Sequence, residues 1–155
     1  MTTLNVGDKA PDFALARDGG GTLSLHDLQG IAFVLYFYPK DDTAGCTQEA
    51  IDFSAMKPDF EKLGVRMIGI SPDSVKRHDK FKSKHDLSIE LLSDEEKSVL
   101  QAYGVWKEKS MYGRKYMGVE RTTFLIGHDG KIADIWTKVR VANHAAEVLA
   151  AAKQL

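Results

Sequence analysis

The chain has 155 residues, of which 43% are hydrophobic and 28% charged, and we expect residues 1–155 to form one globular domain. Its 21 basic and 22 acidic side chains give a net charge of −1, so nothing indicates a nucleic-acid or membrane partner. One cysteine excludes an internal disulfide and cysteine-based zinc sites. The first residues do not resemble an export signal, and we expect a cytoplasmic location.

The first half of the chain is organised around one strongly apolar stretch. Short strands are predicted at Phe13–Ala16 and Thr22–Leu25, joined by a glycine-rich hairpin turn. The apolar stretch Ile31–Tyr38 then predicts a strand that is buried on both faces. A long helix is expected after it, with Thr43 as N-cap and with Pro58 kinking the helix or splitting it in two.

The second half alternates strand and helix patterns, and one segment has no pattern. The predicted elements, in chain order, are the strand Val65–Ser71, the helix Ser74–His85, the strand Ile89–Leu92, the helix Lys97–Tyr103, the loop Trp106–Met117, the strands Val119–Ile126 and Lys131–Thr137, and the helix His144–Lys153. This order fits an α/β, thioredoxin-like fold: a mixed central β-sheet flanked by helices, with an N-terminal β-hairpin.

Cys46 lies where the buried strand gives way to the long helix. A lone cysteine is most often a small buried hydrophobe, but open α/β sheets place active sites at the carboxyl ends of their strands. Keeping a thiol ionised at neutral pH takes roughly 2 kcal/mol, and a helix N-terminus usually supplies only ~0.3–1 kcal/mol. We therefore expect a fixed cation nearby. Lys40 stands beside two aspartates, and Arg121 is the better candidate.

The run PKDDTAGC, from Pro39 to Cys46, resembles the active-site signature of the peroxiredoxins. With VGDKAPDF near the N-terminus and GVERTTFLI around Arg121, it is similar to the Q-type branch, also called bacterioferritin-comigratory proteins. The resemblance implies that Cys46 attacks hydroperoxides and that Thr43 aligns the peroxide. It also implies that Pro39 shields the sulfur and that Arg121 points at it, without any metal or organic cofactor. Glu49 is expected to orient Arg121, and the family likeness implies a monomer.

The cysteine that resolves the oxidised intermediate in many Q-type relatives is missing. One of its usual positions holds Ile51, and the other, in the following helix, holds Lys82 and Ser83. The chain therefore resembles a one-cysteine peroxiredoxin. Its Cys46 sulfenic acid would be reduced by an external thiol: thioredoxin, glutathione with glutaredoxin, or a second molecule of the protein.

Two alternatives remain open at this point. A Cys–His pair would indicate acyl transfer, but all five histidines (His26, His78, His85, His128 and His144) are expected at the surface. A non-catalytic redox sensor or binding protein would use Cys46 oxidation to change a partner contact. A peroxidase that is supplied with reductant consumes many equivalents of peroxide, while a sensor consumes about one. The predicted loop Trp106–Met117 is expected to border the pocket or to adjust when Cys46 is oxidised.

Overall fold

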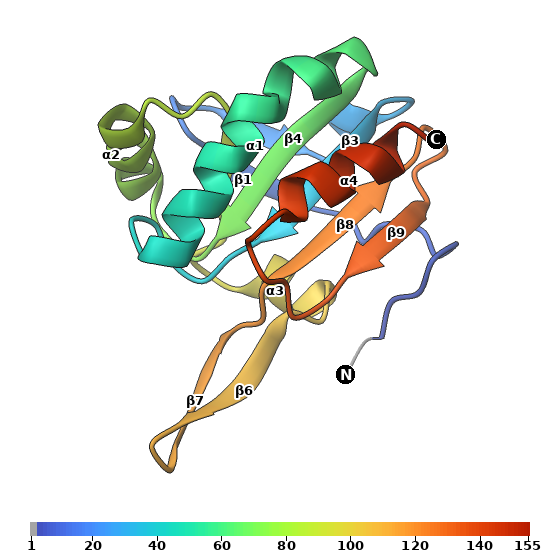
Figure 1. Ribbon diagram of the computed structural model, residues 1–155. Helices are drawn as coiled ribbons and strands as arrows, with labels where there is room; N and C mark the ends of the chain where they lie inside the picture. Colours follow the sequence, from blue (N-terminus) through green and yellow to red (C-terminus); the bar gives the residue numbers. More distant parts are fainter. Residues whose placement is uncertain (1–2) are drawn as a thin grey trace.

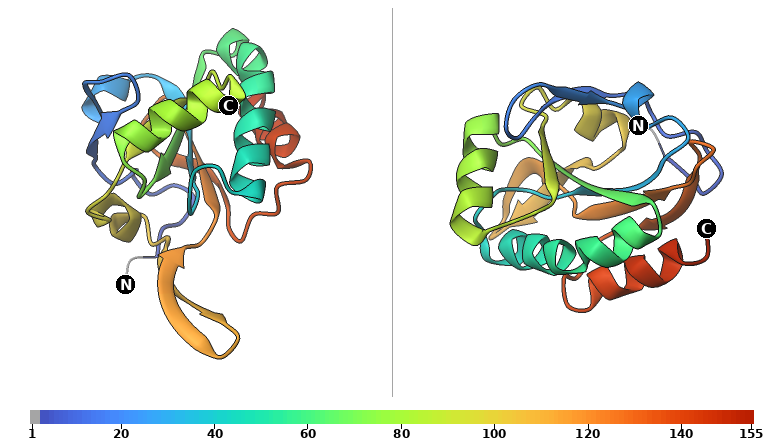
Figure 2. Two further views of the ribbon diagram at one scale, coloured as in Figure 1. Left: turned by 90° about the vertical axis from the view of Figure 1, so that its left-hand side faces the viewer. Right: turned by 90° about the horizontal axis from the view of Figure 1, so that it is seen from above.

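The computed structural model describes residues 3–155, and this part of the chain forms a seven-stranded mixed sheet with helices on both faces (Figures 1 and 2). Its strands, in their order across the sheet, are β2 (Thr22–Ser24), β1 (Ala14–Arg17), β5 (Glu90–Ser93), β4 (Val65–Ser71), β3 (Ala32–Phe37), β8 (Thr122–Ile126) and β9 (Ile132–Trp136). The other elements are the 3-10 helix η1 (His26–Leu28), the helices α1 (Ala44–Lys62), α2 (Val75–His85), α3 (Ser98–Ala102) and α4 (His144–Ala152), and the hairpin strands β6 (Trp106–Met111) and β7 (Arg114–Val119). The predicted architecture is confirmed.

The central strand β3 is buried along its whole length. It pairs in parallel with β4 and antiparallel with β8. Side chains alternate across a strand, so Phe33, Leu35 and Phe37 belong to the core on one face, while Val34 and Tyr36 belong to the core under α1. Burial on both faces explains why the sequence of this strand is continuously apolar.

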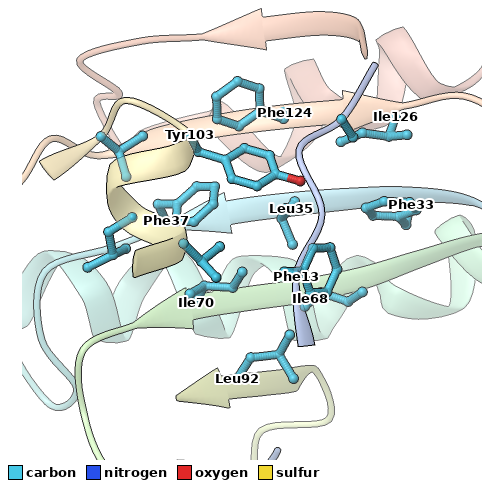
Figure 3. Close-up of a cluster of buried hydrophobic side chains, with 14 of the residues drawn as sticks. Phe13, Phe33, Leu35, Phe37, Ile68, Ile70, Leu92, Tyr103, Phe124 and Ile126 are labelled. Carbon is cyan, nitrogen blue, oxygen red and sulfur yellow. The ribbon is translucent and has the colours of Figure 1, made fainter. Parts of the chain in front are cut away.

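The first of these cores lies between the sheet and α3, and aromatic rings fill it (Figure 3). The ring of Tyr103 packs 5.1 Å from Phe37 and 5.3 Å from Phe124, measured between centroids. Its hydroxyl donates a hydrogen bond of 2.6 Å to the carbonyl oxygen of Pro11. This bond ties the segment before β1 to the end of α3.

The second core lies under α1 and α4, which run side by side on the opposite face (Figure 2). Phe53 and Phe60 of α1, Val148 of α4 and Phe81 of α2 are buried in it. Among the described residues, no helix combines the length and the apolar character that crossing a membrane requires.

Pro58 does not split α1, which continues without a break from Ala44 to Lys62. Proline lacks an N–H, so the carbonyl of Ser54 loses its usual intrahelical donor. The hydroxyl of Ser88 lies 3.4 Å from that carbonyl oxygen and takes the place of the missing donor. The Nζ of Lys57 in turn donates to the carbonyl of Ser88 over 2.7 Å. A neighbouring segment thus compensates for the proline.

The prediction of a loop over Trp106–Met117 is wrong, because this segment forms most of the β6–β7 hairpin. The hairpin extends away from the sheet at the end where α1 begins (Figures 1 and 2). Its turn residues Tyr112 and Gly113 both have positive φ, 52° and 77°, as the tight turn of a two-residue hairpin requires. Most of its side chains are exposed, so its sequence carries no burial pattern.

Candidate active site

Cys46 lies in the first turn of α1, where the loop that follows β3 turns into the helix. Its side chain is buried, with 2% exposed. The first N–H groups of a helix have no intrahelical acceptor and present partial positive charge to groups at that end. The expected placement of the thiol in the first helical turn is confirmed.

Arg121 reaches the sulfur from the position just before β8; the strand predicted over Val119–Ile126 begins only at Thr122. The antiparallel register of β3 and β8 pairs Phe37 with Thr122, so Arg121 leaves the sheet at the end where the loop towards Cys46 begins. Its Nη2 donates a hydrogen bond of 3.2 Å to the Sγ of Cys46. Its Nη1 donates one of 2.6 Å to the Oε1 of Glu49. The structure therefore brings together the cysteine, the cation and the carboxylate that the sequence singled out.

Gly45 makes this approach possible. A Cβ at this position would lie 3.2 Å from the Nη2 of Arg121, which is tighter than an ordinary van der Waals contact. Any other residue would press on the guanidinium at the atom that contacts Cys46. The glycine before the cysteine thus has a steric role.

Glu49 is an almost completely buried carboxylate, one turn after Cys46. Burial raises the pKa of Glu49 to about 7, although the charge and hydrogen bond of Arg121 act in the opposite direction. Burial also lowers the pKa of Arg121, but Glu49 and Cys46 raise it above its ordinary value, so the guanidinium stays charged. Glu49 therefore changes its charge near neutral pH, while its partner does not.

Tyr36 is buried in the same core as Cys46. Its hydroxyl and the Oε2 of Glu49 are buried and have no hydrogen-bond partner among the described residues. Gly69 in β4 provides the space for the ring, because a Cβ there would lie 2.7 Å from the Cζ of Tyr36. Burial and the charge of Glu49 raise the pKa of Tyr36 well above its usual value. The phenol is therefore neutral, with its O–H available as a donor.

Lys109, a cation on β6 whose pKa responds to Arg121 and Cys46, was not singled out from the sequence. Its side chain crosses Gly118 on the hairpin, and a Cβ at Gly118 would lie 3.3 Å from its Cδ. Burial and the charge of Arg121 lower the pKa of Lys109, while Cys46 acts in the opposite direction. Lys40, the alternative cation considered from the sequence, is exposed.

Thr43 and Pro39 belong to the loop that precedes the helix. Thr43 occupies the expected N-cap position, but its side chain makes no capping hydrogen bond. Instead, its hydroxyl donates to the carbonyl oxygen of Lys40 over 2.8 Å. A hydroxyl that donates in this way keeps lone pairs to accept another hydrogen bond. Pro39 is half-buried just after β3.

Asp41, in the same loop, is the centre of a buried network. Its Oδ1 accepts from the hydroxyl of Tyr38 (2.5 Å), its Oδ2 lies 2.6 Å from the Nδ1 of His78, and its N–H donates to the Oδ2 of Asp73 (2.8 Å). The Nε2 of His78 lies 2.8 Å from the carbonyl oxygen of Leu92. Both neighbours of the imidazole are acceptors, so both ring nitrogens carry protons. Burial opposes this charge, but the hydrogen bond to Asp41 raises the pKa of His78 above its ordinary value.

Asp41, Asp73 and His78 are also a group whose possible metal-ligand atoms all lie within 4.8 Å of one another. The protein itself occupies these atoms. Asp73 Oδ2 accepts from the hydroxyl of Ser71 over 2.7 Å, and Asp73 Oδ1 pairs with the Nε of Arg77 over 3.1 Å. The donor set therefore serves to anchor the loop to α2, and its geometry does not favour a cation.

The expectation that all histidines lie at the surface is wrong for His78 and His144, which are buried. His78 precedes the buried Phe81 by three residues, and this helical spacing could have placed both on one face. His144 Nε2 lies 2.8 Å from Thr123 Oγ1, and burial lowers the pKa of His144 to about 4. In the described part of the chain, neither histidine hydrogen-bonds to Cys46, so a Cys–His pair for acyl transfer is not formed.

Comparisons with known proteins show the family to which the chain belongs. The model of the AhpC/TSA family matches residues 6–135. The putative peroxiredoxin Bcp of Coxiella burnetii is 51% identical over 95% of this chain and 97% of its own, and the peroxiredoxin Bcp of Bacillus subtilis is 48% identical over 99% and 98%. A solved structure of the Xanthomonas campestris bacterioferritin comigratory protein matches 92% of this chain and 90% of its own, with 44% identity and a TM-score of 0.88. The chain belongs to the AhpC/TSA family, in which it is a peroxiredoxin of the Bcp, or Q, type.

Proposed function

We propose that this protein is a thiol-dependent peroxidase that reduces hydrogen peroxide and organic hydroperoxides through the thiolate of Cys46, with residues 1–155 acting as one domain. The observation that carries the proposal is the 3.2 Å hydrogen bond from Arg121 Nη2 to Cys46 Sγ. A guanidinium has donors and no acceptor, so Arg121 is placed to donate to the sulfur that attacks the peroxide. The X. campestris relative has alkyl peroxide reduction activity, which supports organic hydroperoxides as substrates.

In the proposed reaction the thiolate of Cys46 attacks the terminal oxygen of the hydroperoxide. The new S–O bond forms as the O–O bond breaks, and the leaving alkoxide or hydroxide takes a proton to become an alcohol or water. The sulfur is oxidised to sulfenic acid and the peroxide is reduced. Arg121 and the N–H groups of the first turn of α1 stabilise the negative charge as it moves to the leaving oxygen.

Thr43 and Pro39 complete the proposed site. The hydroxyl of Thr43 accepts the hydrogen of the peroxide and aligns the O–O bond with the sulfur, a role that its hydrogen bond to the carbonyl of Lys40 supports. Pro39 limits the access of water to the sulfur and to the sulfenic acid. Glu49 holds the guanidinium of Arg121 in place from the other side. No organic cofactor or metal ion takes part in the proposed reaction.

An external thiol completes the proposed cycle, because Cys46 is the only cysteine of the chain. One thiol attacks the sulfenic acid and releases water, and a second breaks the resulting mixed disulfide. Thioredoxin and glutathione with glutaredoxin supply such thiols. We further propose that the protein works as a monomer in the cytoplasm.

Intact-mass measurement after one equivalent of hydrogen peroxide, with and without a sulfenic-acid trap, tests the chemistry. We expect an adduct of the trap on the native protein and none on Cys46→Ser. A native protein that stays unmodified while the denatured protein reacts with peroxide would show that Cys46 is a structural thiol.

The rival function is a redox sensor, whose Cys46 reacts once and then alters a partner contact. Consumption of hydrogen peroxide in the presence of excess dithiothreitol distinguishes the two functions. A peroxidase consumes many equivalents per protein molecule, while a sensor consumes about one. Many turnovers that persist in Cys46→Ser would contradict both functions.

A further inference from the structure

The two faces of the β6–β7 hairpin differ in charge. Directly opposed residues of an antiparallel pair project from the same face, and the register pairs Lys109 with Tyr116 and Met111 with Arg114. One face, which we call the basic face, consists of Lys107, Lys109, Met111, Arg114, Tyr116 and Gly118. The other face consists of Trp106, Glu108, Ser110, Lys115, Met117 and Val119. All the charged residues of the basic face are cations.

The cations of the basic face are not all neutralised within the protein. Lys107 Nζ lies 3.1 Å from the Oε2 of Glu120. Neither Lys109 nor Arg114 has a carboxylate partner in the part of the chain that the structure describes. On the other face, by contrast, the one cation Lys115 lies 3.7 Å from a carboxylate oxygen of Glu108.

The basic face is continuous with the peroxide site. Lys107, on this face, pairs with Glu120, the residue that immediately precedes Arg121 in the chain. At the base of the hairpin, the side chains of Lys109 and Tyr116 pack over Gly118, where a Cβ would lie 3.3 Å and 3.5 Å from them. The face thus begins beside the segment that carries Arg121 and runs outward along the hairpin. The hairpin itself extends away from the sheet (Figure 1).

Apolar side chains accompany these charges. Met111 is 56% exposed and Tyr116 is 44% exposed, both on the basic face, and Tyr112 at the tip is 99% exposed. Exposed aromatic and methionine side chains next to cations are typical of protein interaction surfaces. Each hairpin strand has six residues, a length of about 20 Å, while an extended tripeptide thiol spans only about 10 Å. The length of the face therefore favours a protein over a small thiol.

We propose that the basic face is the docking surface for a protein dithiol with an acidic surface, which reduces the oxidised Cys46. The inference rests on the proposed function, because it needs the sulfenic acid to form. One thiol of the partner attacks the Cys46 sulfur, the S–O bond breaks and water leaves. The second thiol then attacks the partner sulfur of the mixed disulfide. Cys46 returns to the thiol, and the partner is oxidised to a disulfide.

Two charge reversals on neighbouring residues test this surface. Arg114→Glu reverses a charge on the basic face, and Lys115→Glu makes the same change on the opposite face. Peroxide turnover is measured with reduced thioredoxin and, separately, with dithiothreitol. The rate with thioredoxin divided by the rate with dithiothreitol is then compared between the wild type and each variant. We expect Arg114→Glu to lower this ratio about tenfold and Lys115→Glu to change it less than about twofold. Added salt screens the charges, so it should reduce the difference in this rate ratio between the wild type and Arg114→Glu.

Equal ratios for the two variants would overturn the inference, as would a wild-type protein that turns over with dithiothreitol or glutathione but not with thioredoxin. Absence of turnover with every thiol would mean that the proposed function itself fails. Concentration-dependent self-association in analytical ultracentrifugation, abolished by Arg114→Glu and not by Lys115→Glu, would identify the occupant as a second copy of this chain and also overturn the inference.

Discussion

The guanidinium of Arg121 donates to the sulfur of Cys46 over 3.2 Å, across 75 residues of sequence. The pairing of β3 with β8 creates this contact, since it places Thr122 opposite Phe37 and so brings Arg121 to the loop that precedes α1. Glu49 holds the other side of the guanidinium over 2.6 Å. The start of α1, the start of β8 and the buried carboxylate of Glu49 together position Arg121 at the sulfur of Cys46.

Removal of this cation should slow the peroxide step. In Arg121→Ala we expect the rate of Cys46 oxidation by hydrogen peroxide to fall by about 10²-fold, because the main donor to the sulfur and to the leaving oxygen is lost. Stopped-flow oxidation under single-turnover conditions measures this rate. Lys40→Ala removes an exposed cation from the loop between β3 and α1. This variant serves as the control and should react like the wild type.

A change in stability could imitate this effect, because Arg121→Ala leaves Glu49 buried without its partner. The double variant Arg121→Met with Glu49→Gln leaves no unpaired buried charge at these two positions. We expect it to be as slow as Arg121→Ala while unfolding at a higher temperature. Wild-type oxidation rates in the double variant would show that Arg121 is dispensable for the chemistry.

A small change at Gly45 should affect activity without harming the fold. The added methyl of Gly45→Ala would lie 3.2 Å from Arg121 Nη2 and push the guanidinium by a few tenths of an ångström. Alanine favours a helix over glycine by up to about 1 kcal/mol, so the thermal midpoint should stay the same or rise. We expect slower oxidation of Cys46 in this stable protein. A variant as fast as the wild type would show that the site tolerates a displaced Arg121.

The parts of the fold that could be predicted from the sequence are those whose burial gives a periodic signal. The continuous apolar run around β3 and the run Val65–Ser71 located the two central strands to within two residues. The β6–β7 hairpin was missed because both of its faces are largely exposed, so neither alternation nor an apolar run marks it. Its turn at Tyr112-Gly113 was the local signal available.

The residues of the site, too, could be predicted only in part. Cys46, Arg121 and Glu49 stand in recognisable segments, and the structure brings them together. Lys109 and Asp41 could not be found in this way, because their importance comes from neighbours far away in sequence. Asp41 acquires its role from His78, 37 positions further on, and Lys109 acquires its role from the register of the hairpin. Polar contacts of this kind are specified by tertiary packing alone.

Glu49 should make the stability of the protein depend on pH. Burial raises the pKa of Glu49 from 4.5 to about 7, so the folded protein binds this proton more tightly than the unfolded chain does. The stability that results is fully present below pH 4.5 and is lost as the pH rises to about 7. Over this range, we expect the free energy of unfolding of the wild type to fall relative to Glu49→Gln by about 3 kcal/mol. Urea denaturation at a series of pH values measures both proteins. Parallel pH profiles would contradict the raised pKa.

His78 should contribute to the stability of the fold through its buried ion pair with Asp41. Its pKa is raised in the folded protein, so its contribution is fully present below the ordinary pKa of histidine and is lost as the pH rises through the raised value. Removing one partner of a buried ion pair costs about 3–5 kcal/mol, so His78→Ala should be strongly destabilised at pH 6.

The matched control for His78→Ala lies on the same helix. His85 contacts Asp42 of the same loop over 2.8 Å, but Asp42 is 42% exposed. A partly exposed pair contributes about 0–1 kcal/mol, so His85→Ala should change stability little. Urea denaturation at pH 6 and pH 9 should show the gap between wild type and His78→Ala narrowing at the higher pH. A gap that is the same at both values would mean that His78 stabilises the fold through packing and not through its charge.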